Sequence, residues 1–377
     1  MIYILRNTFI PNTASSNRAL AYYRAMDKMG IDATIVLLQT YPSNQILNEN
    51  FNHLKIQFFI KSGYCGNKTI RRFQYILRAR RFLSCLKKGD KVYIYGENPL
   101  IHTLVNKRGI DVFVEITEHP LIYPVRTRFI NNSHKKSIED LKKIKGLFVI
   151  SDYLKSFFLS QGIDPKCINI INMMVDAQRF NGLKKRPEKR YVCYCGNCNN
   201  KKDKVDDLIR AFGLVSQQMP DVFLYIVGPK EQVYSDEQNN VKLAESLGLK
   251  EKVLFTGVLP ADKIPQILVN AELLLLYRPD TLQNRAGFPT KLGEYLLSGT
   301  PVVATKIGDI PLFLKHRENA YLISTGNIEL FASELMFALN NHELSTMIGE
   351  NGKKLALNCF NAETETKKLI SIITENR

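Results

Sequence analysis

The feature that most constrains the fold is an alternation of short apolar runs with helix-length stretches, which occurs twice along the chain. The apolar runs of the first half are residues 2–7, 32–39, 91–96, 111–117 and 146–151, and those of the second half are 191–196, 222–228, 252–257, 271–277 and 301–305. Strands that alternate with helices predict parallel βαβ units. We therefore expect an α/β protein with two doubly wound domains that face each other across a cleft.

The length of the chain also favours two domains, because 377 residues exceed what one core usually supports. Residues 180–190, "FNGLKKRPEKR", are polar and without periodicity, as expected of a linker. We place the first domain at 1–185 and the second at 186–355. Residues 356–377 should form a helix that packs back toward the first domain.

Positive charge is concentrated in the first half. Residues 1–188 contain 30 Lys and Arg against 14 Asp and Glu, whereas residues 189–377 contain 22 of each. This asymmetry indicates an anionic partner for the first half: a membrane surface, a nucleic acid or an acidic substrate. A nucleic-acid binder should have a base-stacking platform or a groove-entering helix, and the sequence shows neither.

One segment of the basic half is a candidate membrane contact. Residues 68–88, "KTIRRFQYILRARRFLSCLKK", interleave Phe73, Ile76, Leu77 and Phe82 with five arginines. A basic amphipathic helix of this kind suits anionic lipid head groups, and the alternative is a helix with a core-facing stripe and a solvated basic face. No run reaches the ~18 apolar residues of a membrane span.

The cysteines favour reduced thiols in a cytoplasmic protein. The basic first half would allow this protein to attach peripherally to the inner face of a membrane. There are seven cysteines, an odd number scattered along the chain. Cys193, Cys195 and Cys198 are close in sequence, but no histidine or second cysteine pair follows nearby. We expect buried thiols here rather than a zinc site, and no Asp-x-Asp triplet suggests another metal.

The segment "GFPTKLGEYLLSG", residues 287–299, predicts a helix with a polar N-terminus. Leu292 and Leu296 lie on its apolar face, whereas Thr290, Lys291 and Glu294 lie off it. First-turn amides and the positive end of the helix dipole suit phosphate, the Lys291 side chain could reach outward to it, and Glu294 could accept hydrogen bonds from sugar hydroxyls. The alternative is an exposed i,i+3 charge pair.

Glycines end three strands of the second half, at Gly196, Gly228 and Gly257. A strand-ending glycine allows the backbone to approach a ligand closely. Ligands of open parallel sheets bind beyond the carboxyl ends of the strands, which is where these glycines fall.

Together, several stretches resemble the glycosyltransferase group 1 family (family 4), retaining nucleotide-sugar glycosyltransferases with the two-Rossmann-domain GT-B fold. They are "IINMMVDAQRF", "CGNCNNKKDKVDDLIRAF", "LYIVGP", "VLFTGVLP" and "GFPTKLGEYLLSGTPVVATKIGDIP". The resemblance spans about residues 165–325, and the first half resembles the family only in layout.

The resemblance implies roles for individual residues. Lys202 and the backbone at Thr290 and Lys291 would contact the donor diphosphate, and Glu294 would bind the ribose. The resemblance also implies that Gly228 and Gly257 border the base of a UDP- or GDP-linked sugar, and that no metal or other cofactor is required.

Two positions depart from the family pattern. The first Glu of its E-x7-E motif is Ala286 here, which removes a carboxylate expected near the donor sugar. The family's arginine after the loop glycine is Asn197 here, and Arg278 at the end of residues 271–277 could replace its charge; the alternative is a solvated arginine.

Candidates on the acceptor side lie in the first half. Helix-start amides at Ser15, Ser16 and Asn17 could face the cleft, although the family's paired glycines are missing from "PNTASSNRAL". "EITEHPLIYP" follows a strand and contains Glu118 and His119, which together with Lys202 are the catalytic candidates. The family usually has a histidine in this region that lines the sugar pocket, which makes His119 the first choice, and a structural histidine is the alternative.

These observations lead to one main hypothesis and two alternatives. The main hypothesis is a retaining glycosyltransferase with a saccharide or lipid-linked acceptor, in cell-envelope or exopolysaccharide synthesis. The first alternative is a nucleotide-sugar-binding or membrane-docking partner without turnover. The replacement of the family's glutamate by Ala286 and of its arginine by Asn197 would favour this alternative. The second is a sugar-nucleotide epimerase, which would need carboxylates on both sides of the sugar.

Overall fold

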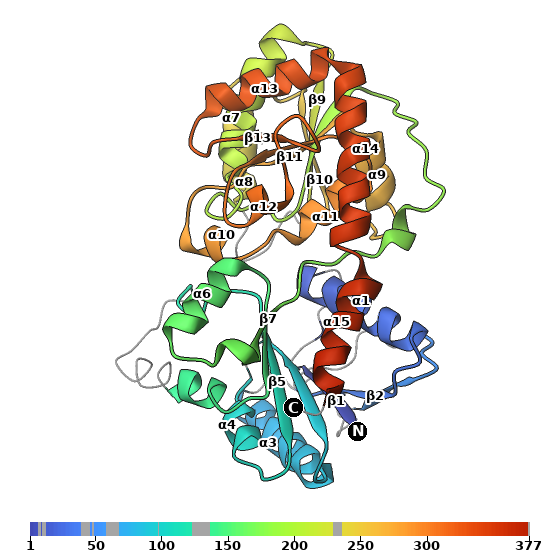
Figure 1. Cartoon of the computed structure of the whole chain (residues 1–377). Helices are drawn as coiled ribbons and strands as arrows, with labels where there is room; N and C mark the ends of the chain where they lie inside the picture. Colours follow the sequence, from blue (N-terminus) through green and yellow to red (C-terminus); the bar gives the residue numbers. More distant parts are fainter. Residues whose placement is uncertain are drawn as a thin grey trace. The chain divides into compact units, whose positions relative to one another are not determined.

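The computed structural model of the chain describes residues 1–6, 9, 13–38, 46, 49–57, 68–96, 98–122, 136–228 and 236–375. The chain forms two compact units, one of Met1–Met174 with Ala362–Arg377 and one of Val175–Asn361 (Figure 1). The sequence placed these boundaries later, at 185/186, and earlier, at 355/356. The boundaries differ because Val175 forms a parallel bridge with Asn361, and its amide donates a hydrogen bond to the Phe360 carbonyl at 3.0 Å. The two places where the chain passes from one unit to the other are thereby linked to each other, and both linked segments belong to unit 2.

Unit 1 contains a seven-stranded sheet whose order is β3-β2-β1-β4-β5-β6-β7 and whose neighbouring strands are all parallel. Its strands are β1 (Ile2–Arg6), β2 (Ala33–Leu37), β3 (Leu54–Gln57), β4 (Lys91–Tyr95), β5 (Asp111–Ile116), β6 (Gly146–Val149) and β7 (Ile168–Ile170). Its helices include α1 (Ala14–Lys28), α3 (Lys68–Cys85), α4 (Ile101–Val105), α6 (Asp152–Ser160), η1 (Pro165–Cys167) and α15 (Ala362–Thr374).

Helix α15 is an integral part of unit 1, although it follows unit 2 in the sequence. Leu369, Ile370 and Ile373 are buried in the same core as α1 and the centre of the sheet. The Glu365 carboxylate accepts hydrogen bonds from the backbone and side-chain amides of Asn172, at 2.8 and 3.3 Å. Apolar packing and buried hydrogen bonds thus both hold this helix to the first half of the chain.

A buried ion pair links α1 to β5 inside unit 1. Arg18 lies 2.8 Å from Glu115, and both side chains are at most 2% exposed. The Tyr22 hydroxyl donates a hydrogen bond to the same carboxylate at 3.0 Å. The Tyr93 hydroxyl also donates a hydrogen bond to this carboxylate. Burial opposes ionisation of the Tyr22 phenol and raises its pKa well above the usual value. Such a satisfied cluster fixes the position of α1 on the sheet.

Unit 2 contains a six-stranded parallel sheet of order β10-β9-β8-β11-β12-β13. Its strands are β8 (Tyr191–Cys195), β9 (Phe223–Val227), β10 (Val253–Gly257), β11 (Leu273–Leu276), β12 (Val302–Thr305) and β13 (Tyr321–Ile323). Its helices include η2 (Ala177–Phe180), α7 (Val205–Gln218), α8 (Glu237–Ser246), α9 (Ile264–Asn270), α10 (Leu282–Ala286), α11 (Thr290–Leu297), α12 (Ile310–Phe313), α13 (Ile328–Asn340) and α14 (His342–Cys359).

The prediction of an α/β protein with two doubly wound sheets is confirmed. Strands β3, β7 and β13, of three or four residues each, were not predicted. In both sheets the strand order reverses next to the first strand, at β1/β4 and at β8/β11. This reversal is the usual position of a ligand site. Among the described residues, no helix is both long and apolar enough to cross a bilayer.

Candidate functional site

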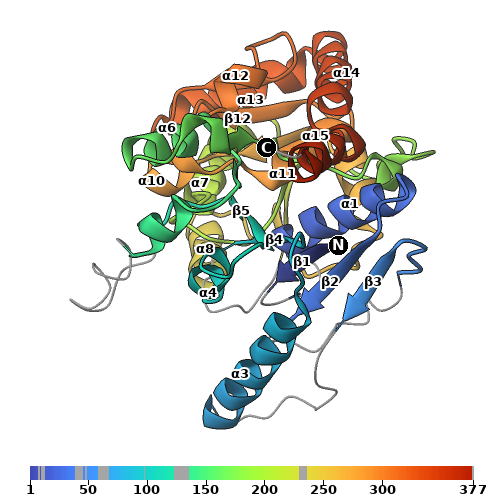
Figure 2. The ribbon, with the colours of Figure 1, turned by 60° about the horizontal axis from the view of Figure 1, so that its bottom comes forward.

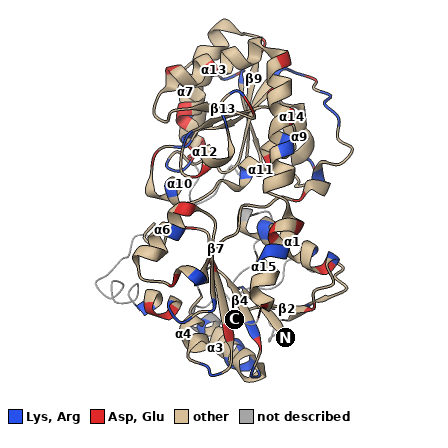
Figure 3. Ribbon diagram, viewed as in Figure 1, with Lys and Arg blue, Asp and Glu red and all other residues tan. Residues whose placement is uncertain are grey.

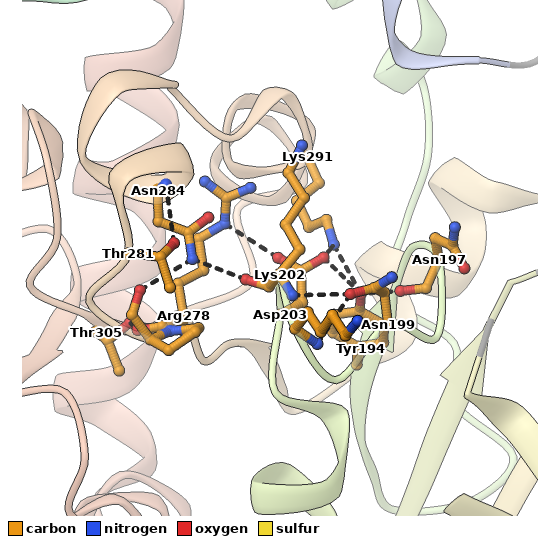
Figure 4. A network of polar contacts seen from close by, with 12 residues as sticks. Tyr194, Asn197, Asn199, Lys202, Asp203, Arg278, Thr281, Asn284, Lys291 and Thr305 are labelled. Carbon is orange, nitrogen blue, oxygen red and sulfur yellow. Dashed lines mark hydrogen bonds and ion pairs between the residues drawn. The ribbon is translucent and has the colours of Figure 1, made fainter. Parts of the chain in front are cut away.

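The candidate site lies in unit 2, where the carboxyl ends of β8 and β11 meet. These strands are neighbours in the sheet and are followed by the loop 196–204 and by residues 277–289. Figure 4 shows that the two segments and the start of α11 bring Lys202, Asp203, Arg278 and Lys291 together. All four belong to unit 2, so this cluster is complete within one half of the chain.

Asp203 is the centre of the cluster. Its Oδ1 lies 3.0 Å from Nε of Arg278, and its Oδ2 lies 2.7 Å from Nζ of Lys291. The Tyr194 hydroxyl lies 2.9 Å from Oδ2 and accepts a second hydrogen bond from Lys291 at 2.9 Å. The Asp203 side chain is only 6% exposed, so each of these charges depends on the others for stabilisation.

The pKa directions follow from this arrangement. Burial by itself would raise the pKa of Asp203, but the charges of Lys291 and Arg278 outweigh it and hold this pKa well below its usual value. Burial lowers the pKa of Lys291, and the Asp203 charge opposes that decrease. The cluster therefore contains an ionised carboxylate between two cations, with Lys202 in the same loop as a third.

Three expectations for these cations need correction. Arg278 is 4% exposed and paired with Asp203, so the alternative of a solvated arginine is wrong. Lys291 does not reach outward as expected, because its Nζ turns back to Asp203 and its side chain is 18% exposed. The exposed i,i+3 pair of Lys291 with Glu294 does not form either.

Glu294 is instead paired with an arginine that the sequence analysis missed. The Glu294 carboxylate accepts a hydrogen bond from Nη1 of Arg179, whose Nη2 donates to the Ala261 carbonyl oxygen at 2.9 Å. Arg179 lies in η2, within the "VDAQRF" segment that enters unit 2. Both side chains are about one-quarter exposed, so the carboxylate is in contact with solvent as well as with Arg179.

The main chain of Lys202 is held on both sides. Its amide donates to Oδ1 of Asn199 at 2.8 Å, and its carbonyl accepts from Nδ2 of Asn284 at 2.9 Å. Asn284 also donates to the Pro279 carbonyl at 2.9 Å, so it connects the loop after β8 with the segment after β11. Like Arg179, Asn284 was missed by the sequence analysis, because its partner, the Lys202 carbonyl, is 82 residues away.

Helix α11 begins at Thr290, as predicted, and its N-cap Pro289 makes no side-chain capping hydrogen bond. The amides of Thr290 and Lys291 therefore lie at a helix start with a positive dipole end. Ala286, at the place of the family's first glutamate, is fully buried at the end of α10. No carboxylate stands at that position.

The three strand-ending glycines differ in what a side chain would meet there. A Cβ atom at Gly228 would lie 1.9 Å from the Gly196 carbonyl oxygen, and one at Gly196 would lie 2.3 Å from Nζ of Lys291. Gly257 has a φ of +72°, which favours glycine. Asn197 is half-buried in the loop that follows, and its Oδ1 is a buried atom with no hydrogen-bond partner in the described structure.

The acceptor-side candidates all lie in unit 1. The Thr13 hydroxyl caps α1 by accepting a hydrogen bond from the Ser16 amide at 3.3 Å, and Ser16 is buried whereas Ser15 and Asn17 are exposed. The amide of Ser16 is thus already used by the cap. These residues follow β1, and Glu118 and His119 follow β5; β4 separates the two strands.

His119 is a buried residue rather than a surface histidine. It is 3% exposed, and its ring packs 4.2 Å from that of Phe157 on α6. Its Nδ1 accepts a hydrogen bond from the Leu121 amide at 3.2 Å. Glu118 beside it is half-buried.

The three clustered cysteines are thiols. Cys193 and Cys198 are buried and Cys195 is half-buried, and burial raises the pKa of Cys195 to about 12. Among the residues that the structure describes, no group of three or more His, Cys, Asp or Glu side chains is placed to hold a metal ion.

Comparison with known proteins agrees with the fold. The family "Glycosyl transferases group 1" matches residues 176–355. N-acetyl-alpha-D-glucosaminyl L-malate synthase of Bacillus anthracis is 26% identical over 317 residues, which are 84% of this chain and 72% of that protein.

Two solved structures have the same fold. HepE of Anabaena, in complex with UDP and glucose, has a TM-score of 0.77 at 17% identity and covers 99% of both chains. WaaG, a glycosyltransferase involved in lipopolysaccharide biosynthesis, has a TM-score of 0.72 at 15% identity and covers 100% of both. Residues 176–355 thus match the group 1 glycosyltransferases, and the chain has the GT-B fold.

Proposed function

We propose that the chain is a cytoplasmic, retaining, metal-independent glycosyltransferase that uses a UDP- or GDP-linked sugar. The acceptor would be a saccharide or a lipid-linked saccharide in cell-envelope or exopolysaccharide synthesis. The observation that carries this proposal is the convergence of Lys202, Arg278 and Lys291 beside the start of α11. The UDP and glucose bound by HepE and the lipopolysaccharide role of WaaG support it.

The charge of the cluster suits a diphosphate. Asp203 neutralises one of three cationic side chains, so the group formed with Lys202, Arg278 and Lys291 has a net charge of +2. The first-turn amides at Thr290 and Lys291 add donors and the positive end of the helix dipole. These groups would stabilise negative charge as it develops on the leaving diphosphate, without a metal ion.

The transfer itself exchanges one bond for another. The bond between the anomeric carbon and the diphosphate oxygen breaks, and its electron pair stays on the diphosphate. The acceptor hydroxyl oxygen bonds to the anomeric carbon on the same face, and its proton passes to the leaving diphosphate oxygen. The cationic cluster lowers the barrier because it interacts most strongly with the diphosphate once that charge has formed.

The other candidate residues would hold the two substrates. Glu294 would accept hydrogen bonds from the ribose hydroxyls, and Gly228 and Gly257 would border the base. In unit 1, His119 with Glu118, and Ser15 with Asn17 at the start of α1, would contribute to sugar and acceptor binding.

One observation favours a second candidate function, a donor-binding protein without turnover. Position 286 holds a buried alanine in place of the family's glutamate, so a carboxylate expected near the donor sugar is missing. This alternative predicts donor binding without transfer, and an experiment that measures both separates the two functions.

The first measurement is thermal unfolding with UDP, GDP, ADP and CDP in the presence of EDTA. A nucleotide at 100 times its dissociation constant should stabilise the chain by about 2.7 kcal/mol. We expect this stabilisation with UDP or GDP, and its loss in Lys202→Gln and Glu294→Gln. Lys201→Gln is the matched control, because Lys201 is the exposed neighbour of Lys202 in the same loop.

Turnover is then followed with the sugar forms of the nucleotide that binds. Release of the nucleoside diphosphate in EDTA, with retained anomeric configuration in the product, supports the proposed reaction. Binding with no release, to water or to any tested acceptor, would favour the donor-binding protein. No stabilisation by any nucleotide would refute the site itself.

A further inference from the structure

Helix α3 presents apolar side chains on the side that faces away from the core of unit 1. Ile70, Phe73 and Ile76 are 44%, 60% and 39% exposed. They are spaced by three residues and so lie on one broad face of the helix. Three large apolar side chains next to one another on a helix surface indicate an interaction site.

The opposite face of α3 is the one that packs on the sheet. Phe82 is fully buried and contacts Tyr3 edge-on with ring centroids 5.7 Å apart. Arg78 is 6% exposed and donates a hydrogen bond to the Leu38 carbonyl at 3.0 Å. Because this opposite face packs in the core, Phe73 and Ile76 do not belong to a core-facing stripe. The alternative of a helix with a core-facing stripe is therefore wrong for these two residues. Figure 2 shows α3 extending away from strands β1, β2 and β3.

The same outward side is basic. Arg72, Arg80 and Arg81 on α3 are exposed, and so are Lys87 and Lys88 just after it. Residues 68–88 contain no Asp or Glu, so α3 carries only basic charges in Figure 3. An apolar patch on a helix whose charged residues are all basic matches a surface that is apolar inside and anionic at its boundary.

A hollow of about 400 Å³ adjoins α3 on the side of α4. It is lined by Leu83, His102, Thr103, Asn106 and Lys107. Leu83 follows Ile76 by seven residues and therefore lies on the same side of α3. The hollow continues the outward face and adds a further basic group beside it.

We propose that this face, defined by Ile70, Phe73, Ile76, Arg72, Arg80 and Arg81, binds an anionic membrane surface. The three apolar side chains insert at the boundary between head groups and acyl chains, and the arginines contact lipid phosphates. The charge complementarity selects an anionic bilayer over an apolar protein partner. The proposal does not depend on the glycosyltransferase reaction, since it concerns a separate surface of unit 1.

The test is co-sedimentation of the full chain with vesicles, in the absence of donor and acceptor. Vesicles of phosphatidylcholine with 30–40% phosphatidylglycerol are compared with phosphatidylcholine alone, at low and at ~0.5 M salt. Each basic residue near an anionic surface strengthens membrane binding about fivefold, so the double change Arg80→Gln with Arg81→Gln should weaken vesicle binding about 25-fold. Phe73→Ser should weaken it about tenfold, also at high salt.

Matched controls use equally exposed residues elsewhere. Leu312 is 65% exposed in unit 2, and Lys353 and Lys354 are exposed on α14. Leu312→Ser and the double change Lys353→Gln with Lys354→Gln should leave binding within about twofold. Equal binding to both kinds of vesicle, or equal losses in the control and α3 variants, would overturn the proposal.

Sedimentation without lipid tests the other occupant of the face, a second copy of the chain. A dimer in the wild type that Phe73→Ser converts to a monomer would assign the face to self-association and overturn the membrane proposal. A monomer in both, with vesicle binding as described, supports it. Nucleotide binding by all these variants should be unchanged, which separates this outcome from failure of the proposed function.

Discussion

The neutralisation of Asp203 is the most demanding perturbation of the candidate site. Asp203→Asn keeps the size of the side chain but removes the only counter-charge shared by Arg278 and Lys291 in the cluster. Removing one partner of a buried ion pair typically costs about 3–5 kcal/mol. We expect the lower end, about 3 kcal/mol, because the Lys291 side chain keeps 18% of its exposure to water.

For a unit of this size, each kcal/mol changes the melting temperature by about 2–4 °C. Asp203→Asn should therefore lower the melting temperature of unit 2 by about 6–12 °C. Asp206→Asn is the matched control, since this half-buried carboxylate lies in the first turn of α7, 3.9 Å from Lys204. Its loss should cost less than about 1 kcal/mol, as expected for a helix-terminal charge.

Added pyrophosphate distinguishes an anion site from a purely structural cluster. The variant has a net charge one unit more positive than the wild type, so a bound diphosphate should stabilise it more. The assay is thermal unfolding with and without pyrophosphate at fixed ionic strength. Equal stabilisation of both proteins, or equal melting temperatures of Asp203→Asn and Asp206→Asn, would refute the reasoning.

Three further predictions follow from the same contacts. Because the pKa of Asp203 is held well below its usual value in the folded state, its stabilising contribution should be complete well above about pH 4, where an unfolded Asp titrates, and should decrease as the pH falls below that value; the difference in unfolding free energy between wild type and Asp203→Asn, measured by urea unfolding across pH 3–7, should be constant near neutral pH and begin to narrow toward pH 3. Gly228→Ala should destabilise by more than about 1 kcal/mol, because its Cβ would meet the Gly196 carbonyl, whereas Gly213→Ala in α7 should be neutral or stabilising in the same unfolding assay. Glu294→Gln breaks a partly exposed ion pair and should change stability by less than about 1 kcal/mol while weakening nucleotide binding at least tenfold by calorimetry; equal binding would remove Glu294 from the site.

The sequence predicted the parts of the site that depend on local patterns. Thr290 begins α11 where Gly-Phe-Pro-Thr predicts a helix start, and Arg278 lies two residues after the end of β11. Apolar runs of five or more residues also located most strands, because a buried parallel strand needs such a run.

The partners of these residues could not be predicted from local patterns. Asp203 bonds Arg278 75 residues later and Lys291 88 residues later. Glu294 pairs with Arg179, 115 residues earlier. Which carboxylate meets which cation depends on the order of strands in the sheet, and a single sequence contains no signal for that pairing. The direction of the Lys291 side chain was therefore wrong, although its position was right.

The placement of α15 has a consequence for how the chain acquires its structure. Unit 1 lacks Leu369, Ile370 and Ile373 until the ribosome has completed the last helix, whereas every strand of unit 2 has by then been made. Unit 2 can therefore finish folding during synthesis, and the basic half, although translated first, is completed last. An expressed fragment 1–174 would expose the surface that α15 covers, so a soluble version of this half has to carry residues 362–377, joined by a linker or supplied as a peptide.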